Sequence, residues 1–380
     1  MLGNIVLDNG SGSIKAGMGG YDSPAAVIPA VVGHERLPLV IPSASSEYKD
    51  KKRLFVGEQA QKDRGVLSLS YPIEHGKVVD WDGMEALWHH TFYNELRVDP
   101  KSHRVLLTEA PMNPTKNRER MIELMFETFE VPYLVVKIQA ILSLFASGAT
   151  TGTVLDSGDG VTHIVPIYQG YKIDVLDSIK RLNFAGRDVT DYLQQLLQRR
   201  GSALSFSVAR RELSRDIKEK LSYCALDYDE ELSKAKGGAK DVTYELPDGS
   251  EIVIGSERFM CAEALFNPKI MSKEIHGIHE EIYDSIMKTD IHIRRDLFKN
   301  IVLSGGTTMI PNFETRLYKE LSALTPPSTK VKIKASPERR WAVWKGGSTL
   351  TQLTSFDSMW VSRDEYDEKG VEKVVEEMAD

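Results

Sequence analysis

The chain has few cysteines, no excess of positive charge and no long apolar run. Only Cys224 and Cys261 occur among its 380 residues, and no Cys/His ligand spacing is present, which argues against structural zinc. The formal net charge of −7 argues against nucleic-acid binding by bulk electrostatics. No apolar run approaches the roughly 20 residues that span a bilayer, and the N-terminus lacks the regions of a signal peptide. These absences favour a protein of the reducing cytosol.

The bulk composition is that of a globular protein with room for more than one core. The chain is 41% hydrophobic and 27% charged, which is ordinary for a soluble protein. Its 380 residues suffice for two domains of typical size. A mildly acidic surface favours solubility and basic partners.

Residues 5–15, with the sequence Ile-Val-Leu-Asp-Asn-Gly-Ser-Gly-Ser-Ile-Lys, predict a buried strand followed by a sharp turn. Asp8 closes the strand, and Gly10 and Gly12 let the backbone approach a ligand closely. Lys15 adds a mobile positive charge. These groups suit a phosphate chain with a metal ion beside it. A strand followed by Asp-x-Gly-x-Gly also occurs by chance in hairpins.

The same pattern returns in the second part of the chain. Residues 153–162 form another apolar strand with a glycine-spaced turn, in which Asp156, Gly158 and Gly160 repeat the first spacing. Two such hairpins predict a duplicated fold, with one turn from each half gripping the same phosphates. Residues 301–307 form a third strand-to-glycine turn, which is either a helix start facing a nucleotide or a plain connection.

Residues 34–56 differ from their surroundings. They combine prolines and paired serines with the charged run at residues 49–53. This composition predicts an exposed excursion, either a partner-binding loop or a plain solvated one.

Several ordered runs along nearly the whole chain resemble the actin family. These runs are residues 8–12, 71–76, 88–96, 106–111, 156–163, 185–188, 303–309 and 346–348. Sugar kinases and heat-shock ATPases share the phosphate turns but not the stretches between them. The resemblance therefore favours actin within that superfamily.

The resemblance implies an α/β fold: the duplicated actin-like ATPase fold, with two domains around a nucleotide cleft. The outer domain is expected to have its base in residues 1–33, 72–146 and 342–380 and a small insert in 34–71. The inner domain is expected to have its base in residues 147–184 and 274–341 and its insert in 185–273.

The resemblance also implies ATP or ADP in the cleft, with Mg²⁺ or Ca²⁺. Asp8 and Asp156 are expected to bind the cation through water, because Mg²⁺ usually keeps several waters. The residues expected at the β- and γ-phosphates are Ser11, Gly12, Ser13, Lys15, Gly158, Asp159, Gly160 and Val161. Those expected around the adenosine are Arg215, Lys218, Glu219, Gly306, Met309 and Arg340.

The catalytic set that the resemblance implies is Gln139, His163 and Asp156. Gln139 and His163 are expected to orient the water that attacks the γ-phosphate. Gln139 has no basic pKa and can only align that water, whereas His163 can relay a proton. Two plainer roles are a helix cap for Gln139 and a hydrogen-bonded core position for His163. Because no strong base is present, we expect slow hydrolysis by the monomer.

The function that this resemblance implies is that of a cytoplasmic, cytoskeletal ATPase that assembles with itself into filaments. Polymerisation is expected to speed hydrolysis by rotating the domains about hinges near residues 139–140 and 336–337. One alternative is an actin-related subunit that acts as a nucleotide-stabilised interaction module in a larger complex. Another is a small-molecule kinase or a chaperone ATPase of the same superfamily.

Departures from actin concern the surfaces that partners use. The acidic N-terminal extension is missing and Tyr21 replaces an acidic residue, which argues against actin-like myosin binding. In the plug at residues 270–273, Lys273 is expected to oppose apolar burial, because an unpaired buried charge is costly. His75 matches a position that is methylated in many actins. A groove for actin-binding proteins, such as profilin-like or gelsolin-like proteins, is expected at Phe145, Leu350 and Leu353.

Overall fold

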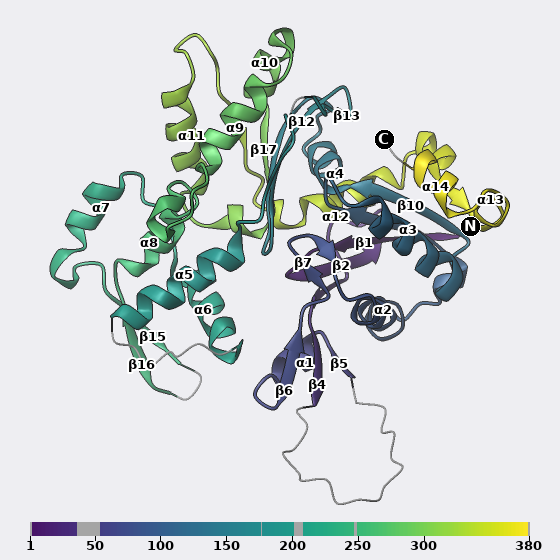
Figure 1. Ribbon diagram of the computed structural model, residues 1–380, viewed down its shortest axis with the longest axis horizontal. Coiled ribbons are helices and arrows are strands. Elements are labelled where there is room, and N and C mark those ends of the chain that lie inside the picture. Colours follow the sequence, from purple (N-terminus) through teal and green to yellow (C-terminus); the bar gives the residue numbers. More distant parts are fainter. Residues whose placement is uncertain (1, 36–53, 176, 201–207, 247–248, 379–380) are drawn as a thin grey trace, which may run out of the picture.

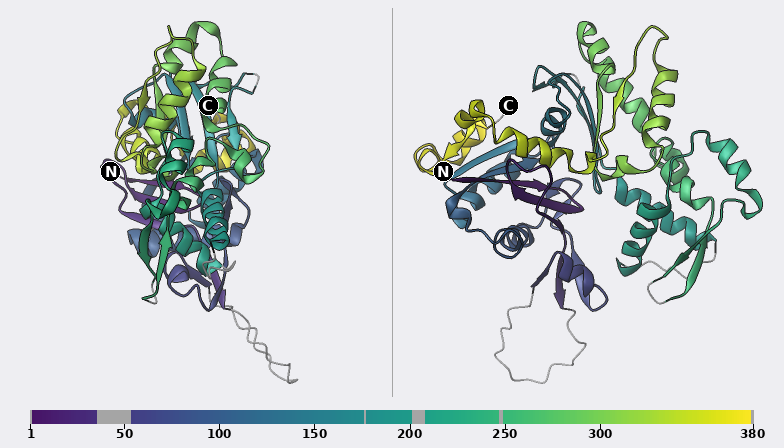
Figure 2. Two further views of the ribbon diagram at one scale, coloured as in Figure 1. Left: turned by 90° about the vertical axis from the view of Figure 1, so that its left-hand side faces the viewer. Right: turned by 180° about the vertical axis from the view of Figure 1, so that it is seen from behind.

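The structure, a computed structural model, describes residues 2–35, 54–175, 177–200, 208–246 and 249–378. Two halves lie side by side (Figure 1), and the molecule is narrow when it is seen edge-on (Figure 2). The N-terminal strand and the C-terminal helices belong to the same half. Most of the excursion predicted at residues 34–56 lies outside the described residues.

The first half is built on a six-stranded sheet with the order β19-β10-β9-β1-β2-β3. Its strands are β1 (Gly3–Asn9), β2 (Ser13–Met18), β3 (Ala26–Pro29), β9 (His103–Glu109), β10 (Tyr133–Ile138) and β19 (Val361–Ser362). Strand β1 pairs antiparallel with β2 and parallel with β9. The apolar run at residues 5–7 is fully buried, as is typical of a central strand with both faces covered.

The second half repeats this arrangement. Its sheet has the order β13-β12-β11-β17-β18, with β14 also paired to β12. The strands are β11 (Gly152–Ser157), β12 (Thr162–Tyr168), β13 (Tyr171–Lys172), β14 (Lys180–Leu182), β17 (Ile301–Ser304) and β18 (Ile333–Lys334). Leu7 lies opposite Leu107, and Leu155 lies opposite Leu303, in parallel pairs. Asp8 and Asp156 come directly after Leu7 and Leu155, so they occupy equivalent positions in the two sheets, as the duplicated pattern predicts.

Three small sheets lie outside these two. Strand β4 (Val32–Glu35) pairs with β5 (Leu54–Val56) and β6 (Leu67–Ser70). Strand β7 (Ile73–Glu74) pairs with β8 (Lys77–Val78), and β15 (Val242–Glu245) pairs with β16 (Glu251–Ile254). The sheet of β4, β5 and β6 lies at the lower end of the first half in Figure 1.

Helices cover the sheets, and α4 and α12 lie where the two halves are connected (Figure 1). The α-helices are α1 (Glu58–Lys62), α2 (Trp81–His89), α3 (Thr115–Glu123), α4 (Gln139–Ala146), α5 (Gly186–Arg199), α6 (Val208–Leu221), α7 (Tyr228–Lys234), α8 (Glu257–Glu263), α9 (Ile278–Met287), α10 (Ile291–Phe298), α11 (Phe313–Leu324), α12 (Ala342–Leu350), α13 (Arg363–Lys369) and α14 (Val371–Glu377). The π-helices are η1 (His90–Leu96) and η3 (Leu124–Thr128). Short 3₁₀ turns are η2 (Pro100–Ser102), η4 (Lys236–Gly238), η5 (Pro268–Met271), η6 (Gly306–Met309), η7 (Arg339–Trp341) and η8 (Thr354–Met359).

The chain passes between the halves at two places, through α4 and again before α12. Gly346 allows these two helices to touch, because a Cβ there would lie 2.0 Å from the Leu142 carbonyl oxygen. The predicted hinges lie at these crossings, and the hinge motion and the four subdomain boundaries stay predictions. None of the helices in the described ranges is long and apolar enough to cross a bilayer.

Candidate functional site

The two glycine-spaced turns touch each other across the middle of the molecule. A Cβ on Gly12 would lie 2.8 Å from the Cβ of Asp159, and one on Gly160 would lie 2.8 Å from the Cβ of Ser11. Only glycine, which has no side chain, permits such a close approach, and this explains why glycine occupies both positions. The backbone N–H of Gly76 donates to the Ser11 hydroxyl at 2.8 Å and ties the connection between β7 and β8 to the first turn.

A cleft of 290 Å³ opens at these turns and adjoins a second cavity of 250 Å³. The predicted residues that line the cleft are Asp8, Ser11, Gly12, Ser13, Lys15, Gln139, Asp156, Gly158, Asp159, Gly160, Val161, Arg215, Glu219, Gly306 and Arg340. Lys218 and Met309 line the adjoining cavity. His163 lines neither of them and is fully buried. The fold therefore gathers residues from distant segments into one site.

Asp8 is held as a buried charge at the base of the cleft. Its side chain is 4% exposed, and the Lys15 Nζ lies 3.2 Å from its Oδ2. The Thr108 hydroxyl donates to its Oδ1 at 2.8 Å. A buried carboxylate is tolerated only when it is paired and hydrogen-bonded, and these contacts meet that requirement.

Asp156 is the second carboxylate in the cleft. Burial raises its pKa, a hydrogen bond with Ser304 opposes that shift, and the charge of Asp8 adds to it. Two carboxylates that repel each other fit a divalent cation, for which oxygen ligands and retained waters are usual. In the described part of the chain, no group of three or more His, Cys, Asp or Glu side chains is placed to hold a metal ion.

Gln139 does not cap its own helix, so that alternative is wrong. It is the first residue of α4, whose cap receives no side-chain hydrogen bond. Its Nε2 instead donates to Asp8 Oδ1 at 3.1 Å and to the Asn9 carbonyl at 3.1 Å. A third contact joins Nε2 to Thr108 Oγ1 at 3.3 Å. Gln139 therefore belongs to a polar network below the cleft.

His163 is neutral and has no protein partner within the described ranges. Burial, and to a smaller extent the charge of Arg181, lowers its pKa to about 3. Both of its ring nitrogens are buried without a hydrogen-bond partner among those residues. The alternative of a hydrogen-bonded core histidine is therefore wrong. A buried imidazole of this kind can accept or donate to a water molecule.

The adjoining cavity is organised around the carbonyl of Gly158. The Thr307 hydroxyl donates to this oxygen at 2.6 Å, and the Gly186 N–H donates to it at 3.1 Å. Lys218, which is 8% exposed, donates to the Gly186 carbonyl at 2.8 Å. Lys218 is therefore a buried residue that connects α6 to α5, and it lines the cavity in which the adenosine was expected.

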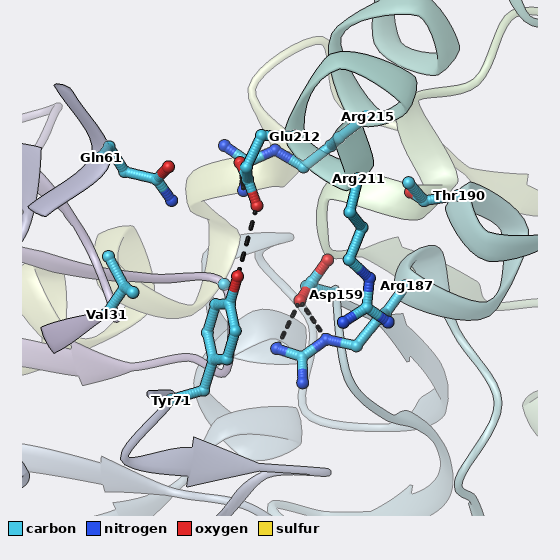
Figure 3. A pocket seen from close by; sticks show the side chains of 10 residues that line it. Val31, Gln61, Tyr71, Asp159, Arg187, Thr190, Arg211, Glu212 and Arg215 are labelled. Atoms are coloured by element: carbon cyan, nitrogen blue, oxygen red, sulfur yellow. Dashed lines mark hydrogen bonds and ion pairs between the residues drawn. The ribbon is translucent and has the colours of Figure 1, made fainter. Parts of the chain in front are cut away.

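A cross-cleft contact, formed by Tyr71, Arg187 and Glu212, joins the halves beside a cavity of 20 Å³ (Figure 3). The Tyr71 hydroxyl donates to Glu212 Oε1 at 3.5 Å, and the Arg187 guanidinium lies 4.7 Å from the centre of the Tyr71 ring. Arg187 also pairs with Asp159 of the second turn at 3.1 Å. Burial and then the charge of Glu212 raise the pKa of Tyr71, so the phenol stays a donor. The second turn is thereby connected to the first half.

Two predicted partner surfaces can be located. In the groove, Phe145 and Leu350 are half-buried and Leu353 is 40% exposed. In the plug, Lys273 pairs with Asp188 at 2.7 Å and lies 5.0 Å from the Phe184 ring. Because the charge is paired, the expected penalty for an unpaired buried lysine does not arise.

Sequence reasoning missed several polar residues of the site: Asn9, Thr108, Ser304, Thr307, Tyr71 and Arg187. All six lie inside runs that resemble actin, so the resemblance marked them without giving them a role. Their roles depend on pairing between distant segments. Thr108 reaches Asp8 because β9 lies beside β1, which local periodicity cannot reveal.

Comparison with models of known protein families matches this chain to the family described as Actin. The match extends over residues 2–379. It includes both hairpins, the residues that line the cleft and the cross-cleft contact.

Proposed function

Because the chain belongs to the actin family, we propose that it binds ATP or ADP with Mg²⁺ or Ca²⁺, assembles into filaments and hydrolyses ATP on assembly. Members of this family generally bind such a nucleotide with a divalent cation, and the wider superfamily consists largely of ATPases. One observation carries the proposal for this chain. Two glycine-spaced turns from different sheets meet at one cleft, which is lined by two aspartates and by the amide side chain of Gln139.

Each part of the cleft has a role in this proposal. The backbone amides of both turns and Lys15 hold the phosphates, because N–H groups and a lysine complement negative oxygens. Asp8 and Asp156 hold the cation through water, and the cation neutralises phosphate charge when it is bound. Lys218, Met309 and Arg340 surround the adenosine. The 250 Å³ cavity they line adjoins the phosphate region.

The hydrolytic step in this proposal depends on positioning. The partners of Gln139 Nε2 at Asp8 and Asn9 are acceptors, so the amide oxygen is the atom available to accept from a water in the cleft. Asp156 lines the cleft. Neutral His163 lies buried outside the cleft lining, so it could relay a proton only through an intervening water. Alignment without a strong base accounts for slow hydrolysis in the monomer. Assembly then speeds hydrolysis by changing the angle between the halves.

The remaining proposals concern partners and place in the cell. The protein is proposed to be cytoplasmic and cytoskeletal, with its own copies as the principal partner. Profilin-like or gelsolin-like proteins are proposed to bind at Phe145, Leu350 and Leu353, of which Leu353 offers the most exposed apolar surface. Tyr21, in place of an acidic residue, argues against strong myosin binding.

The test uses purified full-length protein with Mg-ATP. High-speed pelleting and electron microscopy follow assembly, while phosphate release is recorded in parallel. Filaments that release phosphate faster than the monomer are expected. Gln139→Ala is expected to assemble and to release phosphate more slowly, and an unchanged rate in assembled protein would refute the water-aligning role.

An actin-related subunit without turnover is the competing function. It would bind ATP with a cation but form no filaments at tens of micromolar protein across salt conditions. The two functions therefore separate on assembly and share nucleotide binding. The observation that favours turnover is the Gln139 network, which engages Nε2 and leaves the amide oxygen as the remaining acceptor of a residue that lines the cleft.

A further inference from the structure

Thr108, on β9, lies where the network below the cleft converges. It is fully buried and does not line the cleft. Its Oγ1 lies 2.8 Å from Asp8 Oδ1, 3.1 Å from the backbone N of Asn9 and 3.3 Å from Gln139 Nε2. One hydroxyl thus contacts two of the groups assigned to cation and water.

These three contacts fix the direction of every hydrogen bond at the Thr108 hydroxyl. The Asn9 N–H and the Gln139 Nε2 can only donate, so both must donate to the hydroxyl oxygen. A hydroxyl has two acceptor lone pairs and one proton. Its single proton is therefore directed at Asp8, which can accept it as a carboxylate.

The same network fixes the orientation of the Gln139 amide. Nε2 lies near Asp8 Oδ1 and the Asn9 carbonyl, which are both acceptors. The reverse orientation would place the amide oxygen against two other acceptors and the Thr108 lone pairs. The oxygen of Gln139, a residue that lines the cleft, is therefore turned away from these three groups.

We propose that Thr108 is a positioning residue that sets the Asp8 carboxylate and the Gln139 amide together. Through Asp8 it acts on the divalent cation, and through Gln139 it acts on the attacking water. This inference rests on the proposed function, because it requires a cation and a nucleotide in the cleft. Thr108 itself contacts neither ligand.

Removal of the hydroxyl is expected to weaken cation binding and to slow phosphate release. Thr108→Val keeps the branched shape but leaves the Asn9 N–H without its acceptor. It also removes the hydroxyl donor from Asp8 Oδ1, which keeps the Gln139 amide. Loss of a hydrogen-bonding partner behind a metal ligand typically costs about 10- to 100-fold in metal affinity or activity. Thr108→Ser keeps the hydroxyl and is expected to recover most of both properties.

Thr91 provides a matched control for the loss of a buried hydroxyl. It is fully buried in the same half, and its Oγ1 donates to the Leu87 carbonyl at 2.7 Å inside a helix. Thr91→Val therefore removes a similar hydrogen bond away from the cleft. Its Mg²⁺ affinity and phosphate release are expected to match those of the wild-type protein.

The experiment measures Mg²⁺-dependent retention of a fluorescent ATP analogue by full-length wild type, Thr108→Val, Thr108→Ser and Thr91→Val. Magnesium is titrated at fixed nucleotide, phosphate release is followed in assembled protein, and melting temperatures check the fold. Thr108→Ala, which also lacks the hydroxyl, takes the place of the valine variant if that variant does not fold. Weaker Mg²⁺ dependence and slower release only in the variants without the hydroxyl would support the inference.

Other outcomes overturn the inference in distinguishable ways. Normal Mg²⁺ dependence in Thr108→Val would refute the positioning role and leave the proposed function standing. An equal loss in Thr108→Ser or in Thr91→Val would show that packing or general stability, and not this hydroxyl, is responsible. A wild-type protein that retains no nucleotide at any Mg²⁺ concentration would refute the proposed function, and this inference with it.

Discussion

The two hairpins place an aspartate at the same register position and give it different partners. On the first hairpin Asp8 lies opposite Lys15, and on the second Asp156 lies opposite His163. Lys15 pairs with Asp8 at 3.2 Å. His163 is neutral, because burial lowers its pKa to about 3. The charge of Asp8 is thus neutralised by a lysine of its own hairpin. Asp156 has no lysine opposite it, so neutralisation of its charge depends on what enters the cleft.

The two turns are therefore held by different kinds of contact. The first turn is a fixed base, in which Asp8, Thr108 and Gln139 are hydrogen-bonded within one sheet and its following helix. The second turn reaches across the cleft, because Asp159 holds Arg187 and Arg187 lies over Tyr71. The second turn is thus the one that is connected to the opposite half of the molecule.

Substitution of each aspartate by asparagine should separate the two turns most strongly. Without nucleotide, Asp8→Asn is expected to lower the free energy of unfolding by about 3 kcal/mol, because it leaves Lys15 unpaired in a buried setting. Asp156→Asn is expected to leave it unchanged or to raise it, because burial already disfavours the charged form of Asp156. Both variants should lose about 100-fold in Mg-ATP affinity. Urea unfolding and ligand titration measure these changes, and equal effects on unfolding would contradict the comparison.

Gly160→Ala should break the contact between the turns. The new Cβ would lie 2.8 Å from Ser11 and 3.2 Å from the His75 backbone N, so the turns must separate. A steric cost of this kind corresponds to about a tenfold loss of nucleotide affinity. Gly158→Ala is the matched variant, because its Cβ would meet only the Val161 carbonyl oxygen at 3.9 Å, and it should lose less. Nucleotide titration measures the affinity of both variants. A larger loss of affinity in Gly158→Ala than in Gly160→Ala would show that close contact between the turns is not what the glycines provide.

His163 should make stability depend on pH. Its pKa falls from 6.5 to about 3 on folding, so between these values the unfolded chain binds a proton that the folded protein does not. The resulting stabilisation is complete above pH 6.5 and is lost as the pH falls toward the folded pKa. The slope is at most about 1.4 kcal/mol per pH unit. Urea unfolding at several pH values should show a shallower dependence in His163→Gln, and parallel curves would contradict the assigned pKa.

The smallest effect is expected at the cross-cleft contact. Tyr71→Ala removes a cation–π contact worth about 1 kcal/mol, so nucleotide exchange should speed up about fivefold. Tyr71→Phe keeps the ring and should exchange nearly as slowly as the wild type. Tyr171→Ala, at a tyrosine that is 71% exposed, is the control. Release of a fluorescent nucleotide measures the exchange rate of all three variants. An unchanged rate in Tyr71→Ala would show that the cross-cleft contact does not slow nucleotide exchange.

The sequence predicted the turns well because their chemistry is local. Glycine spacing after an apolar strand specified both turns, and their repetition predicted the duplicated sheets. The burial of Lys218 and the pairing of Lys273 with Asp188 could not be predicted, since each depends on a partner many residues away. His163 lay in a recognised run, but its missing protein partners follow from packing alone.

If the two turns hold one cation and one nucleotide together, their aspartates should not act independently. A double-mutant cycle with Asp8→Asn and Asp156→Asn, measured as Mg²⁺-dependent ATP affinity, tests this coupling. If both carboxylates serve the same cation, the double variant should lose little more affinity than either single variant. Two losses that simply add, or ATP affinity that does not depend on Mg²⁺ in the wild type, would contradict the claim.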